Sequence, residues 1–311
     1  MSTLFTFPGQ GAQRAGMLHE LPQDAAVRDT LAEASDTLKL DVLTLDSDAA
    51  LRSTVAAQLC LLVAGVAMAR SLAAQGARPD AVAGLSIGAY PAAVTASVLS
   101  YADALRLVDR RARLMEAACP SGFGMTAILG LERAALEPLI ARVHTSHTPV
   151  YLANINAPTQ LVIAGAHAAM ANVSELAQQA GAHGIRPITI SVPSHCALLD
   201  KPAAHLMHHM ARVALGAPRM RYFSASLGRE LRDATRIAHD LAHNMGLPVN
   251  WHETSVLTSE RGVGLVVEMP PGNVLTKLSA AALPELLAVA AADTRADTIV
   301  ELMAREARRE G

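Results

Sequence analysis

The sequence predicts a large α/β domain built on a parallel sheet and interrupted by a small ferredoxin-like α+β domain. Short apolar runs end at glycine-rich turns and lead into helical apolar spacing, which is typical of parallel βα units. Residues 124–192 instead follow the order β-α-β-β-α-β, the split βαβ pattern. A chain of 311 residues has room for about two domains. We therefore expect residues 1–123 and 193–311 to form the large domain and 124–192 the inserted one.

The first third of the chain supplies the opening elements of the large domain. We expect strands over 4–7 and 81–85, and helices over 27–38, 53–74, 91–98 and 101–118. The uncharged stretch 81–101 is long enough to span a membrane, but Gly84, Gly88 and Pro91 interrupt it, so we interpret it as strand, turn and helix. The apolar stretch Val55–Ala69 is shorter than the ~20 residues that a span needs.

The inserted domain and the last third follow from the same periodicities. In the insert we expect strands over 125–129, 150–154, 160–164 and 185–192, and helices over 132–143 and 167–179. In the remainder we expect helices over 195–214 and 233–244, and strands over 221–224 and 263–269.

The composition excludes several classes of protein. Hydrophobic residues make up 51% and charged residues 17% of the chain, so a large core can form and extensive disorder is excluded. Lys and Arg number 26 against 28 Asp and Glu, and no basic excess points to nucleic acid or a membrane as partner. Three cysteines without a CxxC pair indicate reduced thiols, and the N-terminus shows no signal peptide. We expect a cytoplasmic protein.

The strongest local signal is Gly84-Leu85-Ser86-Ile87-Gly88, between an expected strand and an expected helix. This is the context of a G-x-S-x-G nucleophile elbow, in which a sharp turn lifts the serine hydroxyl clear of the sheet. The helix N-terminus that follows favours developing negative charge. An ordinary Gly-Ser turn would give the same five letters, so the pattern alone leaves both interpretations open.

The segment Pro8-Gly9-Gln10-Gly11-Ala12-Gln13 follows the first strand in the same way. It lacks the Gly-Lys-Ser/Thr of a Walker A loop and is not a G-x-G-x-x-G motif. Its backbone N–H groups would suit an oxyanion hole if the first two strands are neighbours, because Ser86 would then lie beside it.

A serine nucleophile needs a base, and His195 is the candidate because it follows a strand, where α/β sites are built. A packed structural histidine is the alternative. His239 and His243 faintly resemble H-E-x-x-H without its glutamate, so we expect no metal there. The same holds for the helical group of His205, His208 and His209.

An arginine on the helix after the elbow could grip a carboxylate with two parallel hydrogen bonds. Arg111 lies on an otherwise apolar stretch of that helix. A solvated face is the alternative, and spacing alone does not separate Arg111 from Arg106, Arg110 and Arg113.

Together these motifs resemble the malonyl-CoA:acyl-carrier-protein transacylase family over nearly the whole chain. Seven segments carry the resemblance in order: 7–13, 84–90, 111–115, 156–165, 191–198, 248–251 and 271–275. The resemblance implies an α/β-hydrolase-like large domain and ping-pong transfer of a malonyl group from malonyl-CoA to the thiol of an acyl-carrier protein. It implies Ser86 as nucleophile, His195 as base and Arg111 as partner of the malonyl carboxylate. It implies no cofactor of the enzyme's own, since the prosthetic arm belongs to the carrier.

The resemblance assigns three further positions. The backbone N–H groups of Gln10 and Ile87 would form the oxyanion hole, and a backbone carbonyl at Asn244 would orient the histidine. The elbow departs from the family pattern, since Leu85 and Ala89 stand where His and Glu are usual. This variant is similar to the acyltransferase (epsilon) subunit of malonate decarboxylase. It implies a dedicated carrier and the other subunits of that enzyme as partners.

Three alternatives remain open at this point. The first is a transacylase of fatty-acid synthesis with an unusual elbow. The second is a serine hydrolase or thioesterase, which needs an acid between Ser86 and His195 in the chain. Candidates for that acid are Asp103, Asp109, Glu116, Glu132, Glu137 and Glu175. The third is a non-catalytic subunit, which the presence of Ser86, His195 and Arg111 disfavours.

Overall fold

The computed structural model describes residues 2–119, 121–190 and 192–308. Its larger sheet has the strand order β10-β9-β1-β2-β7-β8, and every pairing is parallel except that of β7 with β8. The strands are β1 (Ser2–Phe7), β2 (Ala81–Gly84), β7 (Arg221–Ser224), β8 (Arg229–Leu231), β9 (Val263–Glu268) and β10 (Leu287–Ala290). The mixed α/β fold with a parallel sheet is confirmed.

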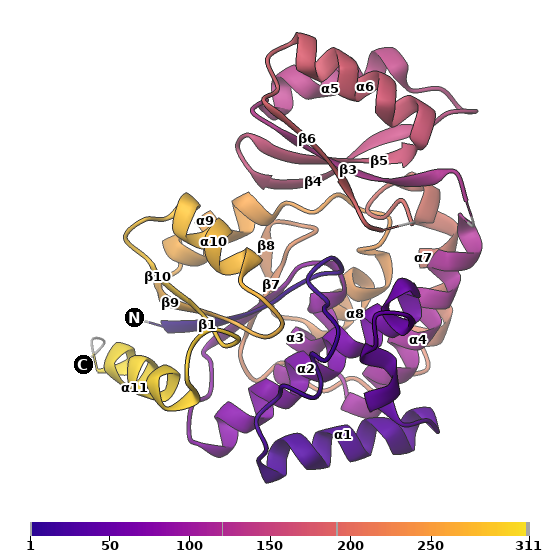
Figure 1. Ribbon diagram of the computed structural model, residues 1–311. Coiled ribbons are helices and arrows are strands. Elements are labelled where there is room, and N and C mark those ends of the chain that lie inside the picture. Colours follow the sequence, from indigo (N-terminus) through magenta and orange to yellow (C-terminus); the bar gives the residue numbers. More distant parts are fainter. Residues whose placement is uncertain (1, 120, 191, 309–311) are drawn as a thin grey trace.

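Helices cover both faces of this sheet (Figure 1). Side chains alternate along a strand, so Phe5 and Leu4 of β1 enter two different hydrophobic clusters. The cluster of Phe5 is shared with α1 (Ala25–Leu38), α2 (Thr54–Ala74), α3 (Ala89–Thr95), α4 (Tyr101–Ala118), α7 (Asp200–Met210), α8 (Ala234–His243) and α11 (Ala296–Ala307). The cluster of Leu4 is shared with α9 (Trp251–Glu260) and α10 (Val274–Ala282). Two short 3₁₀ turns, Val42–Asp46 and Ala50–Arg52, join α1 to α2.

Helix α2 is the central helix of the large domain. Its 21 residues, Thr54–Ala74, have the length and hydropathy of a membrane span, but 89% of the apolar window is buried inside the protein. The helix over 53–74 expected from the sequence is present, and it is longer than its uninterrupted apolar stretch Val55–Ala69. Burial, and not length, distinguishes it from a membrane helix.

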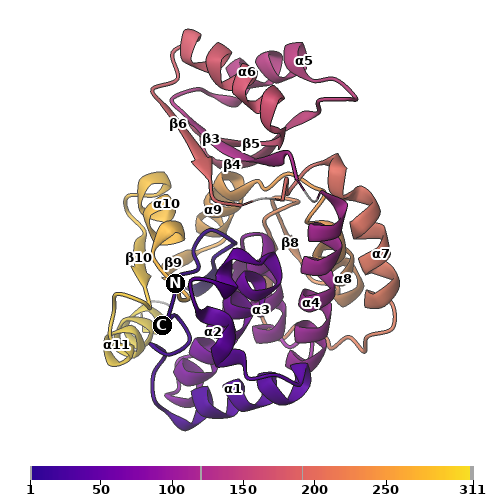
Figure 2. The same ribbon diagram turned by 45° about the vertical axis from the view of Figure 1, so that its right-hand side comes forward.

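The smaller sheet has the order β4-β5-β3-β6 and is antiparallel throughout. Its elements are β3 (Phe123–Leu129), α5 (Arg133–Val143), β4 (Val150–Ala157), β5 (Gln160–Ala166), α6 (His167–Gln179) and β6 (Gly184–Ile188). Helices α5 and α6 lie on its outer face, and the other face is turned toward the large domain (Figure 2). The β-α-β-β-α-β order agrees with the ferredoxin-like pattern, while the boundaries at 124 and 192 stay a prediction.

Strand β4 joins the small sheet to the large domain. The backbone N–H of Ile155 donates to the Val249 carbonyl at 2.8 Å, and the N–H of Val249 donates to the Ala153 carbonyl at 2.8 Å. A parallel bridge thus joins the edge of the small sheet to the segment that precedes α9.

The structure corrects several sequence-based element boundaries. The helix expected from residue 195 begins at Asp200, after a 3₁₀ turn over Ala197–Leu199, because His195 has a left-handed backbone. The strand expected over 185–192 ends at Ile188; Ser191, in the seven-segment resemblance, lies outside the described residues. Among the α-helices and β-strands of the described residues, five were not predicted: β8, α9, α10, β10 and α11.

Candidate active site

Ser86 stands at a sharp turn between β2 and α3. Its φ of 58° is left-handed, a conformation that L-residues adopt only when the surroundings enforce it. A Cβ on Gly84 would lie 2.1 Å from the backbone of Gly88, and one on Gly88 would lie 2.1 Å from the Phe7 carbonyl oxygen. Both glycines are therefore required for the close approach of β1, β2 and the turn. A 3₁₀ turn over Ser86–Gly88 then leads into α3.

The loop after β1 lies against this turn. Strands β1 and β2 are parallel neighbours, with Phe7 opposite Gly84, and the Leu85 N–H donates to the Phe7 carbonyl at 3.0 Å. Among the described residues the backbone N–H of Gln10 has no acceptor. The N–H of Ile87 lies in the first turn after Ser86, where helix N–H groups are free. The loop after β1 and the serine turn are thus neighbours, and the N–H groups of Gln10 in the loop and Ile87 in the turn are free of partners among the described residues.

His195 lies on the loop before α7 and has a φ of 65°. Its backbone N–H donates to the Met245 carbonyl at 2.7 Å. Its Nδ1 lies 2.8 Å from the Asn244 carbonyl and 3.1 Å from that of Leu247. Because a carbonyl only accepts, Nδ1 carries the hydrogen and Nε2 is left as the acceptor. This is the protonation pattern of a general base.

Burial keeps this imidazole neutral. His195 is 3% exposed, and loss of hydration, reinforced by the positive charge of Arg111, lowers its pKa to about 4. The two carbonyls act in the opposite direction but more weakly. Within the described part of the chain no carboxylate is hydrogen-bonded to His195, so the acid of a Ser-His-Asp hydrolase triad is not found there.

Arg111 is fully buried on the inner face of α4. Its Nη2 donates to Ser86 Oγ at 3.2 Å and to Asn244 Oδ1 at 3.1 Å, and its Nη1 donates to Gln58 Oε1 at 2.7 Å. Burial lowers its pKa to about 10, which still leaves it cationic at neutral pH. Among the described residues no carboxylate forms an ion pair with it.

The same helix resolves the ambiguity among the four arginines. Arg106 and Arg113 are exposed and pair with Asp103 and Asp109, and Arg110 is also exposed. Arg111 alone of the four turns inward, since one residue along a helix rotates a side chain by about 100°.

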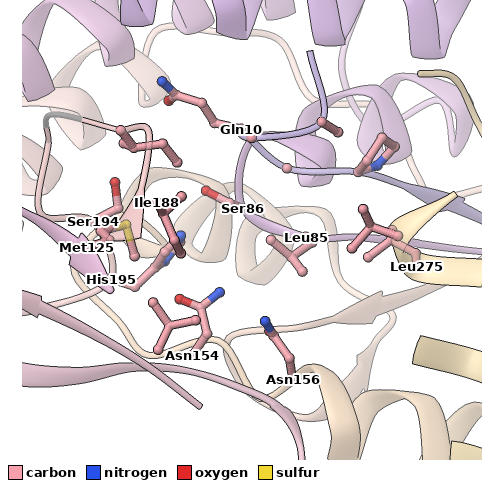
Figure 3. Close-up of a pocket in the computed structure, with 17 residues that line it drawn as sticks. Gln10, Leu85, Ser86, Met125, Asn154, Asn156, Ile188, Ser194, His195 and Leu275 are labelled. Carbon is pink, nitrogen blue, oxygen red and sulfur yellow. The ribbon is translucent and has the colours of Figure 1, made fainter. Parts of the chain in front are cut away.

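A cavity opens above Ser86 between the two sheets. Figure 3 shows Ser86 and His195 beside it, with Asn154 and Asn156 of β4 along one side. Other residues that line it are Gly9, Gln10, Leu85, Met125, Val162, Ile188, Ile190, Ser194, Val274 and Leu275. The side-chain oxygens of Asn154 and Asn156 are buried without a hydrogen-bond partner. The cavity is therefore mostly apolar and has a few polar groups, as ligand sites do.

The structure brings together all six predicted site residues: Gln10, Ser86, Ile87, Arg111, His195 and Asn244. Asn244 does more than expected, since its side-chain amide also donates to the Ser86 carbonyl at 3.2 Å. Sequence reasoning missed Gln58, Asn154 and Asn156. Gln58 had one signal, as a polar residue inside an apolar helix. His239 and His243 stack on each other with ring centroids 4.0 Å apart, outside this site.

Comparison with known proteins decides the family. A profile of the acyl transferase domain matches residues 4–310. The chain belongs to the acyl transferase domain family. It is 36% identical over 305 residues to the malonyl CoA-acyl carrier protein transacylase of Salmonella typhimurium, covering 94% of this chain and 98% of that protein. It is also 36% identical to the malonyl CoA-acyl carrier protein transacylase of Bacillus subtilis, and the match covers 88% of each protein.

Solved structures agree with this assignment. An acyl carrier protein S-malonyltransferase from Vibrio cholerae superposes with a TM-score of 0.91 at 36% identity, covering 96% of this chain and all of that one. A malonyl-transacylase in complex with a type II polyketide synthase acyl-carrier protein gives 0.92 at 35% identity, covering 97% and 100%. The protein is therefore an enzyme that transfers acyl groups.

Proposed function

We propose that this acyltransferase moves a malonyl group from malonyl-CoA to the thiol of an acyl-carrier protein, through a malonyl ester of Ser86. The observation that carries the proposal is the guanidinium of Arg111. It is buried, cationic and without a carboxylate partner among the described residues, and it lies within hydrogen-bond distance of Ser86 Oγ. A buried charge is costly unless it is paired. The carboxylate of a malonyl group supplies the missing partner.

The chemistry follows from the positions of the groups. His195 Nε2 takes the Ser86 proton while Oγ attacks the thioester carbonyl. The backbone N–H groups of Gln10 and Ile87 hold the oxyanion of the tetrahedral intermediate. The C–S bond breaks, and the protonated histidine returns the proton to the leaving CoA sulfur. The carrier thiol then attacks the acyl-serine by the reverse route, and Ser86 regains its proton.

The same arginine explains selectivity. A bound malonyl carboxylate can replace Ser86 Oγ as an acceptor for Arg111, which frees the hydroxyl for attack. An acetyl group leaves the buried charge unpaired, at a cost of about 1–3 kcal/mol or a factor of roughly 5–150 in rate. The apolar cavity between the sheets would keep water from the acyl-serine.

The identity of the carrier separates two candidates. The relatives described above carry the name transacylase, and one is seen with an acyl-carrier protein. These support a transacylase of the fatty-acid or polyketide type over a malonate decarboxylase subunit. The observation in favour of the decarboxylase subunit is the elbow, in which Leu85 lines the cavity and Ala89 follows. In either case we infer a cytoplasmic enzyme with no cofactor of its own.

Intact mass spectrometry tests both levels of the proposal. The protein is mixed with malonyl-CoA and equal amounts of two carriers, one with a phosphopantetheine arm and one with a phosphoribosyl-dephospho-CoA arm. We expect an enzyme adduct of one malonyl group, absent in Ser86→Ala, and faster loading of the phosphopantetheine carrier. Preference for the second carrier would identify a decarboxylase subunit. Release of free malonate without carrier loading would contradict transfer.

A further inference from the structure

Gln58 is a polar residue in the most apolar helix of the protein. It lies on α2, is 1% exposed, and reaches the substrate arginine: its Oε1 accepts from Arg111 Nη1 at 2.7 Å. Its amide nitrogen donates to Gln10 Oε1 at 3.3 Å and contacts Met115 Sδ at 3.5 Å. A guanidinium has only donors, so the oxygen of the amide must face Arg111. The orientation of the Gln58 amide is thereby fixed.

The kind of acceptor matters as much as its position. Buried arginines are ordinarily matched by a carboxylate, which neutralises them. Among the described residues Arg111 donates to three acceptors, the Gln58 amide, the Asn244 amide and the Ser86 hydroxyl, and all three are neutral. These neutral oxygens accept hydrogen bonds from Nη1 and Nη2, while the buried Nε has no partner. They leave the positive charge of the guanidinium uncompensated. The bond to Gln58 is the shortest of the three.

We propose that Gln58 is a positioning residue that sets acyl-group selectivity: its neutral amide anchors Arg111 and reserves the charge of that arginine for a carboxylate on the incoming acyl group. The inference rests on the proposed malonyl transfer and adds to it a residue that determines the substrate class. Gln58 touches Arg111 and Gln10 and needs no contact with the acyl group itself.

A glutamate has the shape of glutamine and differs by one charge, so the proposal has a direct converse. In Gln58→Glu the carboxylate takes the place of Oε1, and an internal ion pair satisfies Arg111. A malonyl carboxylate then meets a neutralised site and a nearby negative charge. An acetyl group no longer leaves a buried charge unpaired. The variant should therefore disfavour malonyl-CoA and favour acetyl-CoA.

The experiment measures acylation of Ser86 from malonyl-CoA and from acetyl-CoA by intact mass against time. In Gln58→Glu we expect kcat/KM for malonyl-CoA to fall at least tenfold, mostly through KM, and the acetyl rate to rise severalfold. Gln58→Met keeps the length without an acceptor and should weaken malonyl loading without an acetyl gain. The matched control is Gln75→Glu, because Gln75 is exposed at the end of the same helix and its Nε2 donates to the Ser71 carbonyl.

The outcomes separate this inference from the proposed function. If the unaltered protein takes no malonyl group from malonyl-CoA, the proposed function is wrong. If the unaltered protein is loaded, and Gln58→Glu keeps the same preference for malonyl over acetyl as the control Gln75→Glu, the role inferred for Gln58 is wrong. If both acyl donors lose rate equally in Gln58→Glu and in Gln58→Met, Gln58 only supports the fold, which also overturns the inference. Thermal denaturation shows whether each variant folds. If Gln58→Glu does not fold, Gln58→Met decides: a loss confined to malonyl loading supports the inference, and an equal loss with both acyl donors overturns it.

Discussion

The two turns that carry the reacting groups hold their residues in the same backbone conformation by different means. Ser86 and His195 have φ values of 58° and 65°. The serine turn is held by backbone contacts at Gly84 and Gly88, where a single Cβ would not fit. The histidine loop is held by hydrogen bonds to carbonyls about 50 residues further along the chain. Steric enforcement tolerates no added atom, whereas hydrogen-bond enforcement tolerates any side chain that leaves the carbonyls in place.

The largest effect is expected from a substitution that breaks the serine turn. In Gly88→Ala the new Cβ would lie 2.1 Å from the Phe7 carbonyl oxygen and 2.7 Å from its carbon, and neither backbone can move without parting β1 from the turn. We expect loss of soluble folded protein, or a fall in unfolding free energy above about 4 kcal/mol, in the range of the most severe core changes. Circular dichroism during thermal denaturation measures it.

Gly76→Ala is the control for this substitution. Gly76 has a left-handed φ of 85°, but nothing lies within 4 Å of its added Cβ. The cost should be that of backbone conformation alone, about 1–2 kcal/mol. Equal destabilisation of the two variants would show that crowding at Gly88 is unimportant.

A smaller loss of activity is expected at Asn244, whose carbonyl contacts His195. Asn244→Ala keeps the carbonyl that faces His195 and removes the amide that binds Arg111 and the Ser86 carbonyl. We expect malonyl loading of Ser86 to fall about tenfold, corresponding to the ~1–2 kcal/mol of the lost hydrogen bonds. Stopped-flow release of CoA reports the rate.

The matched control is Asn250→Ala, which removes an amide that donates to the Ser226 carbonyl at 2.8 Å away from the cavity. It should leave the loading rate within twofold. A loss above a thousandfold in Asn244→Ala would mean that the side chain, and not the carbonyl alone, holds His195.

The smallest expected effect is on the pH dependence of acylation, which tests the environment of the His195 loop. A histidine base must be neutral to take a proton, so kcat/KM falls as pH drops through its pKa. Because burial first and Arg111 second lower the pKa of His195 to about 4, acylation from acetyl-CoA should stay near its maximum at pH 5.5. In Arg111→Met the acid limb should move to higher pH, because a positive charge that lowers the pKa of His195 is removed. A limb near pH 6.5 in the unaltered protein would contradict a desolvated base.

Local patterns were enough to predict the elbow and the regular elements near it. The glycines around Ser86 and the apolar periodicity of β1, β2 and α4 are properties of neighbouring residues, and these predictions agree with the structure. The predicted start of α7 was wrong because the carbonyls of residues 244–247 hold His195 outside the helix. The residues around His195 give no local indication of these distant partners. Of the late helices that were missed, α9 has little amphipathic periodicity and α10 has only nine residues, whereas α11 is clearly amphipathic and could have been predicted.

The site shows the same limit. His195 and Ser86 could be named from motifs, but Arg111 could not be separated from Arg110 without knowing which side of α4 faces the core. Gln58 was missed because its partners, Arg111 and Gln10, lie about 50 residues away in either direction. A polar side chain in an apolar helix is the signal that could have found it, since burial demands a partner.

The bridge between β4 and Val249 has a mechanical consequence. Val249 is hydrogen-bonded on both sides to β4, and it lies two residues beyond Leu247, whose carbonyl contacts His195. A rotation of the small sheet that preserves those two bonds would also move the segment from Leu247 to Val249, and with it a carbonyl that orients the imidazole. Widening the entrance for a bulky donor and tilting the base away from the serine are then one movement.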